Sequence, residues 1–78
     1  MISDQDFAKR VLLETDECFH KFNELLWAAK AELPEVEFVE LRRGIGRVLG
    51  YLYTDVQVPI HKKHPELEPP ELRRKAGV

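Results

Sequence analysis

Glu17 and His20 stand at the Glu-x-x-His spacing that carboxylate-bridged metal sites use in helical bundles. In a dimer of helical hairpins the motif would occur twice, and Glu37 or Glu40 of a second helix would complete a six-ligand set. On a helical wheel, however, Glu17 and His20 point away from the apolar stripe, whereas such ligands must project into the core. A metal-binding bundle therefore remains an alternative, and our main interpretation includes no metal and no cofactor.

Three glycines lie within the stretch "ELRRGIGRVLGYLY", at Gly44, Gly46 and Gly50. Their spacing is close to a dinucleotide-binding fingerprint, in which glycines join a strand to a helix and let the backbone approach a pyrophosphate. A loop would break the helical spacing of the apolar residues, yet that spacing continues across the glycines at Leu41, Ile45, Val48 and Leu52. The stretch therefore predicts a helix with a smooth flank.

Gly46 and Gly50 lie one helical turn apart on this flank, next to Tyr53. Paired small residues at this spacing let another helix approach closely. We therefore predict that Gly46, Gly50 and Tyr53 form a contact surface. Gly44 lies on another side of the predicted helix, and this interpretation gives it no role.

A second group of apolar side chains lies opposite the main stripe of the first predicted helix, at Leu13, His20, Trp27 and Ala31. Tryptophan is enriched at interface hot spots, so Leu13 and Trp27 are predicted to contact another protein or a second copy of the chain. The alternative is that the C-terminal segment of the same chain covers Trp27.

Basic side chains lie within the glycine-containing stretch and after it. They are Arg42, Arg43 and Arg47, those of "HKKH" at 61–64 and those of "RRK" at 73–75. Together they resemble a nucleic-acid footprint. The chain is acidic overall, however, and Glu40 is placed to pair with Arg43 and Arg47. Weak nucleic-acid binding therefore stays an alternative, and a solvated basic patch is expected.

The first element that must position these residues is a long amphipathic helix at about residues 4–33. Ser3 is predicted to cap it, with Asp6 completing a capping box, and Pro34 is predicted to end it. Its apolar stripe recurs at steps of three and four, at Ala8, Val11, Leu12, Thr15, Cys18, Phe19, Phe22, Leu25, Leu26, Ala29 and Leu33. The single cysteine, Cys18, is expected to be buried in this stripe.

A second helix is predicted at about residues 35–57, ending before Pro59. The short connection makes the two helices antiparallel, as a hairpin domain over residues 1–58. The alternative interpretation is that "EVEFVEL" forms a β-strand, because apolar residues alternate with glutamates there. Residues 59–78 are proline-rich and are expected to be an extended or partly disordered tail, pinned by Ile60 and Leu67 and with one helical turn opening at Pro70.

The charge is divided unevenly along the 78 residues. Residues 1–40 carry a net charge of −6 and residues 41–78 a net charge of +4, which favours packing of one half against the other. No apolar run approaches the roughly 18 residues of a membrane span, so the cytoplasm is the expected compartment. The single serine and two threonines offer almost no material for nucleophilic catalysis, and no enzyme activity is expected.

These observations predict an all-α helical hairpin that dimerises into a four-helix bundle. Two helices of about 20 to 30 residues present more apolar surface than one hairpin can cover, and two-fold pairing is the commonest way to close such a surface. The expected function is a non-catalytic interaction or regulatory module with a protein partner, rather than a nucleic-acid or membrane partner.

Overall fold

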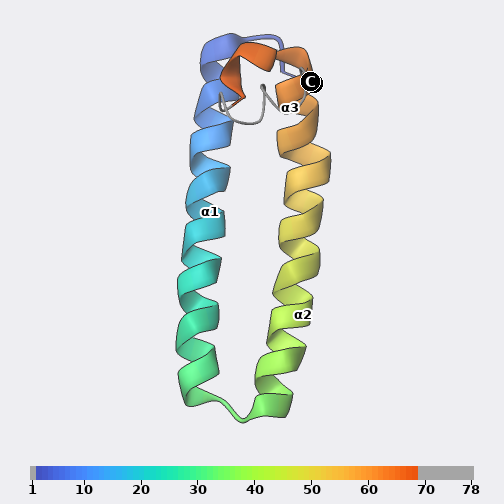
Figure 1. Cartoon of the computed structure of the whole chain (residues 1–78). Helices are drawn as coiled ribbons and strands as arrows, with labels where there is room; N and C mark the ends of the chain where they lie inside the picture. The colour runs from blue at the N-terminus through green and yellow to red at the C-terminus, as the bar shows by residue number, and fades with distance from the viewer. Residues whose placement is uncertain (1, 69–78) are drawn as a thin grey trace, which may run out of the picture.

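The first helix is confirmed as a single long element in the computed structural model, which describes residues 2–68. Helix α1 spans Gln5–Glu32 (Figure 1). Its N-cap is Asp4 rather than the predicted Ser3, because the Asp4 carboxylate accepts hydrogen bonds from the backbone amides of Asp6 (2.9 Å) and Phe7 (3.2 Å). The helix ends at Leu33, whose extended backbone is the conformation that Pro34 imposes on the residue before it.

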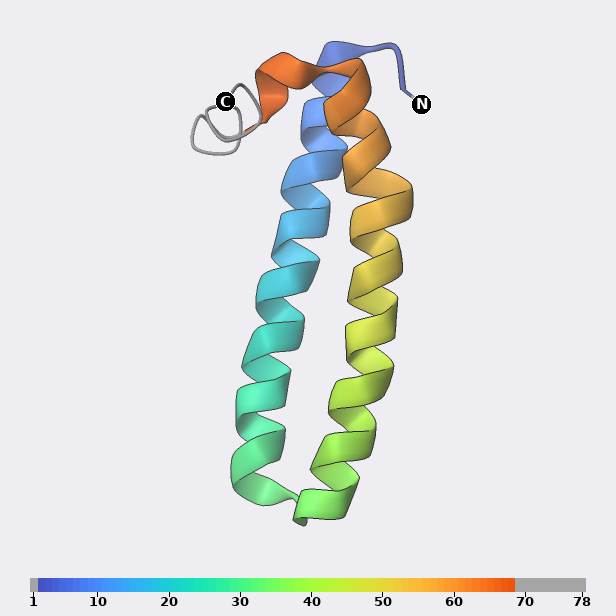
Figure 2. The ribbon, with the colours of Figure 1, turned by 45° about the vertical axis from the view of Figure 1, so that its right-hand side comes forward.

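Helix α2 spans Glu35–Leu52 and runs back along α1, so the hairpin prediction is confirmed (Figure 2). The alternative of a strand at "EVEFVEL" is wrong, because these residues form the first turns of α2. The helix passes through Gly44, Gly46 and Gly50 without interruption, which also rules out a phosphate-binding loop there.

The second helical segment continues past Pro59, contrary to the expected end at about residue 57. After α2, a π-helical turn η1 spans Tyr53–Gln57 and leads into α3 at Val58–Lys63, and a short 3₁₀ turn η2 follows at Pro65–Leu67. Pro59 lacks an N–H group and would crowd the carbonyl of Asp55 in a regular α-helix, and the wider π turn accommodates it. The start of the predicted extended tail is therefore helical, whereas Pro70 and the "RRK" segment lie outside the described residues.

The best-buried cluster lies at the open end of the hairpin, where Ile60 of α3 packs against Ala8 and Leu12 of α1 and the chain after α3 turns across the end of α1 (Figure 2). Ala8 and Ile60 are fully buried and Leu12 nearly so, and they are surrounded by partly buried apolar side chains: Ile2, Val11, Val56 and Leu67. The prediction that Ile60 and Leu67 hold the C-terminal segment against the core is confirmed.

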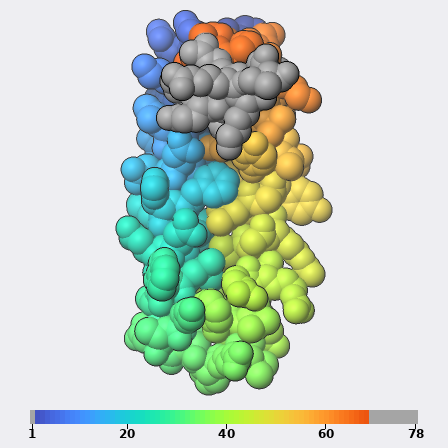
Figure 3. Space-filling model, viewed as in Figure 1, coloured from blue at the N-terminus to red at the C-terminus, as the bar shows by residue number. Residues whose placement is uncertain are grey.

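The rest of the hairpin is packed more thinly. Side chains of α1 and α2 meet over the middle and the loop end of the hairpin (Figure 3), but Ala29 and Ile45 are the apolar residues buried there among those described. Cys18 is exposed, contrary to expectation, because it lies at the edge of the stripe and a two-helix structure has nothing on that side to cover it. One hairpin thus leaves much of its apolar stripe uncovered.

Candidate interaction surfaces

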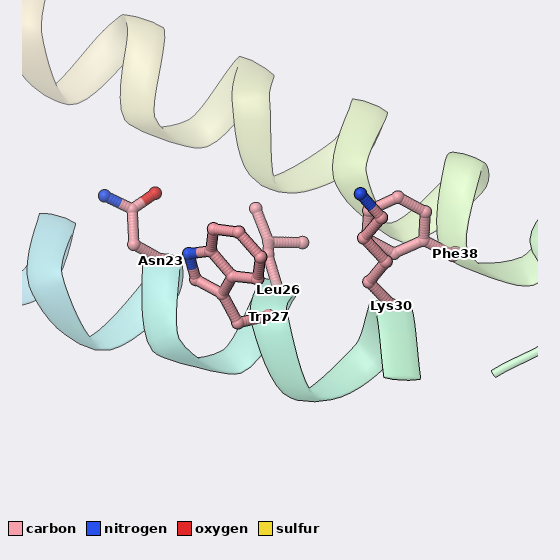
Figure 4. Close-up of a pocket in the computed structure, with 5 residues that line it drawn as sticks. All are labelled: Asn23, Leu26, Trp27, Lys30 and Phe38. Atoms are coloured by element: carbon pink, nitrogen blue, oxygen red, sulfur yellow. The ribbon is translucent and has the colours of Figure 1, made fainter. Parts of the chain in front are cut away.

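Trp27 lies at the loop end of the hairpin and is 74% exposed. It lines a shallow depression of about 170 Å³ together with Asn23, Leu26 and Lys30 of α1 and Phe38 of α2 (Figure 4). The ammonium of Lys30 lies 5.9 Å from the centre of the Trp27 ring, within the range of a cation–π contact. The indole therefore has the Lys30 ammonium near its ring and is otherwise largely exposed.

Leu13 and Tyr53 lie near each other at the open end of the hairpin, on the same side as Trp27. Both line a groove of about 340 Å³ between α1 and the η1–α3 segment, with Lys9, Asp16 and His61 among the other lining residues. Leu13 is 60% exposed and Tyr53 is 48% exposed. The structure therefore brings together two residues that are 40 positions apart in the sequence and that were both predicted to make contacts.

Gly46 and Gly50 lie on α2 between these two hollows. The spacing from Arg42 to Gly46, Gly50 and Tyr53 is four, four and three residues, which keeps them on neighbouring parts of one helix face. A Cβ atom added at either glycine would meet nothing within 4 Å, so no part of the described chain packs closely against them. We call the surface formed by Leu13, Trp27, Gly46, Gly50 and Tyr53 the Trp27 face.

A second surface lies on the opposite side of the hairpin, where both helices present apolar side chains. We call it the apolar face and define it by the exposed residues Phe7, Cys18 and Leu25 of α1 and by Leu41 and Val48 of α2. Phe7 and Leu25 are each 50% exposed and Val48 is 56% exposed, whereas Leu41 is half-buried. Gly44 lies between Leu41 and Val48, and a Cβ atom there would also meet nothing within 4 Å.

The residues of the alternative metal site do not form a site within one chain. Glu17 and His20 are exposed on α1, and Glu37 and Glu40 are exposed on the first turns of α2. In the part of the chain that the structure describes, no three histidine, cysteine, aspartate or glutamate side chains are grouped to hold a metal ion. The Glu-x-x-His pair lies outside the seam between the helices, as the helical wheel indicated.

The basic patch on α2 is solvated. Arg42, Arg43 and Arg47 are exposed, and the guanidinium of Arg42 lies 5.7 Å from the centre of the Phe38 ring. The predicted pairing of Glu40 with Arg43 and Arg47 is not formed, since the ion pair found among residues 2–68 is between His64 and Glu66. Long side chains on an exposed helix face gain little from fixing one such geometry.

A buried glutamine joins the π-helical turn to α1. Gln57 is 6% exposed, and its side-chain amide donates to the Thr15 hydroxyl (2.6 Å) and to the Asp16 carboxylate (3.0 Å). The Thr15 hydroxyl in turn donates to backbone carbonyls one turn earlier, at Val11 (2.8 Å) and Leu12 (3.1 Å). This network fixes the lengthwise position of the second helical segment against α1.

A second polar contact closes the open end. His64 is 7% exposed, and its Nε2 lies 2.7 Å from the carbonyl oxygen of Ile2. A carbonyl can only accept, so Nε2 carries a proton, and Nδ1 lies 3.3 Å from the Glu66 carboxylate. Glu66 also accepts a hydrogen bond from the Gln5 amide (3.0 Å).

The environment of Glu66 favours its ionised form. A hydrogen bond from the backbone lowers the pKa of Glu66 below its usual range. The His64 ring and the Gln5 amide lower the pKa further, against an opposing effect of partial desolvation. The Glu66 carboxylate is thus a charged part of the contact that joins the two ends of the chain.

The sequence interpretation did not identify Gln57, His64 or Glu66 as structural contacts. Gln57 lies outside the apolar spacing, and nothing near it indicated a π-helical turn. His64 follows Ile60 by one helical turn, and this spacing was the available signal, but the prolines on either side favoured an extended tail.

In comparisons with known proteins, no family model matches the chain, and neither the curated proteins nor the solved structures give a significant match. Among the described residues, no helix combines the length and the apolar character needed to cross a membrane.

Proposed function

We propose that this chain is a non-catalytic protein-interaction or regulatory module that acts as a homodimer, with two hairpins closing into a four-helix bundle. The observation that carries the proposal is the incomplete core of the single hairpin. Nine large apolar side chains of the described residues are 38% to 74% exposed, whereas Ile60 is the one large apolar side chain that is completely buried.

The thin core makes association energetically favourable. Burying apolar surface contributes about 25 cal/mol per Å², and a chain of this length buries too little of it alone to be more than marginally stable. A second hairpin laid against the first supplies the missing layer, since a helical stripe must be covered by another element. Two-fold pairing achieves this with a single gene product.

The Trp27 face is the proposed contact surface for a protein partner. It offers an exposed tryptophan, two shallow hollows and a glycine flank, and these features lie on one side of the hairpin. Partly exposed aromatic side chains next to depressions are typical of binding hot spots. A dimer that leaves this face open would present two copies of it.

Sedimentation velocity between low and high protein concentration tests the proposal. A dimer has twice the 9.1 kDa mass of the chain, and its fraction rises with concentration. Leu25→Glu places a charge among exposed apolar residues and should shift the equilibrium to monomer. Glu24→Gln changes the neighbouring exposed residue, removes a charge instead of adding one, and serves as the matched control. A mass of one chain at all concentrations would contradict the proposal.

A further inference from the structure

The groove between α1 and the η1–α3 segment is lined by a buried side chain with an unused acceptor. Gln57 is 6% exposed, and its amide nitrogen donates to the Thr15 hydroxyl and to the Asp16 carboxylate. Because a carboxylate only accepts, these bonds fix which branch of the amide is the nitrogen and which is the oxygen, Oε1. Among residues 2–68, no donor meets Oε1, and no unpaired side-chain oxygen of a covered residue is sealed from solvent. The groove is therefore where a donor can reach Oε1.

A second acceptor lies beside the first. Asp16 lines the same groove, and one of its carboxylate oxygens accepts the hydrogen bond from Gln57 at 3.0 Å. Its other oxygen has no hydrogen-bond partner in the part of the chain that the structure describes. An arginine side chain carries five N–H donors in one plane and can donate to both oxygens, whereas a lysine ammonium is a compact point charge. The pair of acceptors thus favours a guanidinium.

The walls of the groove suit the rest of such a side chain. Leu12, Leu13 and Leu67 are the apolar lining residues, and Tyr53 adds an aromatic ring. Arginine lays its methylene groups along apolar surface, and its planar head stacks on aromatic rings. The groove therefore combines an apolar wall with a polar, negatively charged position.

The sequence of the chain continues from the rim of this groove. Leu67 is one of the lining residues, and the described part of the chain ends one residue later. Arg73 and Arg74 follow Leu67 by six and seven residues. Six extended residues span up to about 20 Å, whereas the stretch of α1 that lines the groove, residues 9–16, is about 12 Å long. Both arginines are therefore within reach of Asp16.

The order of the charges also matches. Lys9 and His61 line the groove as well, and a lone guanidinium would be repelled by them when they are charged. The sequence provides a carboxylate for these groups at Glu71, two residues before Arg73. A chain that runs from the open end towards the loop end passes Lys9 before Asp16, so opposite charges meet at both positions.

We infer that this groove binds an arginine side chain, supplied by Arg73 or Arg74 of the same chain, and that the guanidinium donates to Gln57 Oε1 and to the Asp16 carboxylate. The bound segment would cover Leu13 and Tyr53 and leave Trp27 open. It would thereby regulate access to the open-end part of the Trp27 face, a consequence that rests on the proposed contact role of that face.

A nitroxide label after the arginines tests the inference in the full chain. The label is attached to a Cys18→Ala, Ala76→Cys variant, and the reduced label gives the reference NMR spectrum. A short tether gives the segment a high effective concentration, so the amide signals of Leu13 and Gln57 should lose intensity by roughly twofold or more. The signal of Val36 at the loop end should not change. Unchanged signals at Leu13 and Gln57 would overturn the inference.

A mixed sample identifies the source of the arginine. It combines ¹⁵N-enriched chains that carry no label with labelled chains at natural abundance, so that any loss of signal comes from another copy. We expect no loss at Leu13 or Gln57 in this sample. A loss seen there, and absent when label and ¹⁵N are on one chain at high dilution, would show that a second copy supplies the segment and would overturn the inference.

Two sets of variants test the chemistry of the contact. Replacing both arginines, Arg73→Ala with Arg74→Ala, should restore the signals, as should Asp16→Asn, which still accepts from the Gln57 amide but has no charge. The matched control, Arg42→Ala with Arg43→Ala, removes two guanidinium groups from α2 and should leave the loss unchanged. Circular dichroism checks that each variant stays helical. A loss of signal that persists without Arg73 and Arg74 would contradict the arginine site.

Sedimentation of the same samples separates this inference from the proposed homodimer. A dimer without loss of signal at Leu13 and Gln57 would overturn the arginine site and leave the homodimer standing. A monomer that shows the loss would support the arginine site and overturn the homodimer.

Discussion

The hydrogen bonds of Gln57 predict a large loss of stability on its truncation. In Gln57→Ala the bond to the Thr15 hydroxyl and the bond to the Asp16 carboxylate are both lost. A neutral hydrogen bond contributes about 1 kcal/mol, and one to a charged group about 1.5–3 kcal/mol. Because Asp16 is exposed, water weakens the contribution of the hydrogen bond to its carboxylate. We therefore expect a total loss of about 2 kcal/mol in the free energy of unfolding.

This loss is large for so small a chain. The free energy of unfolding of folded proteins is roughly 0.05–0.15 kcal/mol per residue, so that of the whole chain is about 4–12 kcal/mol. A domain of this size shifts its Tm by about 4–8 °C per kcal/mol, so Gln57→Ala should melt about 8–16 °C lower. Urea unfolding followed by circular dichroism measures the effect, at one fixed protein concentration because dimerisation would alter the midpoint.

Two further variants separate the hydrogen bonds from packing. Gln57→Leu keeps most of the side-chain volume but removes both donors, and Thr15→Val removes one acceptor. If the network couples them, the double variant loses clearly less stability than the sum of the single variants. A loss below about 0.5 kcal/mol in Gln57→Ala, typical of an ordinary surface position, would refute the reasoning.

Four other predictions follow from the surfaces and from Glu66. Trp27→Ala should change the free energy of unfolding by less than about 0.5 kcal/mol in urea unfolding, because the side chain is 74% exposed. Gly46→Ala should raise the Tm, since alanine is favoured by about 1 kcal/mol within a helix and its Cβ would meet no neighbour; a lower Tm would indicate a close packing that the hairpin does not show. Because the pKa of Glu66 is lowered in the folded state, its contribution to stability is present above the unfolded value near 4.5 and lost as the pH falls through the folded value; Glu66→Gln should flatten this part of the stability profile. Incubation with iron, manganese or zinc followed by elemental analysis should leave the protein empty, and one metal per chain that is lost in His20→Ala would instead support the metal-binding alternative.

The helical hairpin could be predicted because local signals and apolar spacing agree. The long row from Ala8 to Leu33 indicated α1, and Pro34 fixed its end. The unbroken spacing through Leu41, Ile45 and Val48 showed that the glycines lie in a helix. These signals depend on near neighbours in the chain, so the sequence alone contains them.

The structure at the open end of the hairpin could not be predicted in the same way. Pro59 indicates a helix end locally, but the π-helical turn before it lets the helix continue and brings Ile60 against Ala8. Gln57 and His64 find partners in α1 and in the N-terminal segment, far away in the sequence. Contacts between distant segments override local propensity, and a single sequence does not show which distant residues meet.

The candidate surfaces were predicted in part. The grouping of Leu13 with Trp27 followed from the helical wheel, whereas the groove that Leu13 and Tyr53 both line depends on how the two helices align. The helical wheel predicts Cys18 in the core, because it does not show how wide a stripe one partner helix covers. Its exposure reveals the second, apolar side of the hairpin.

The mass of the species that the chain forms in solution tests the proposed homodimer most directly. Sedimentation equilibrium over a hundredfold range of protein concentration should give a reversible transition from one chain to two, with the mass levelling at twice 9.1 kDa. A mass that stays at one chain throughout, or that increases without levelling at two, would contradict the proposed homodimeric bundle.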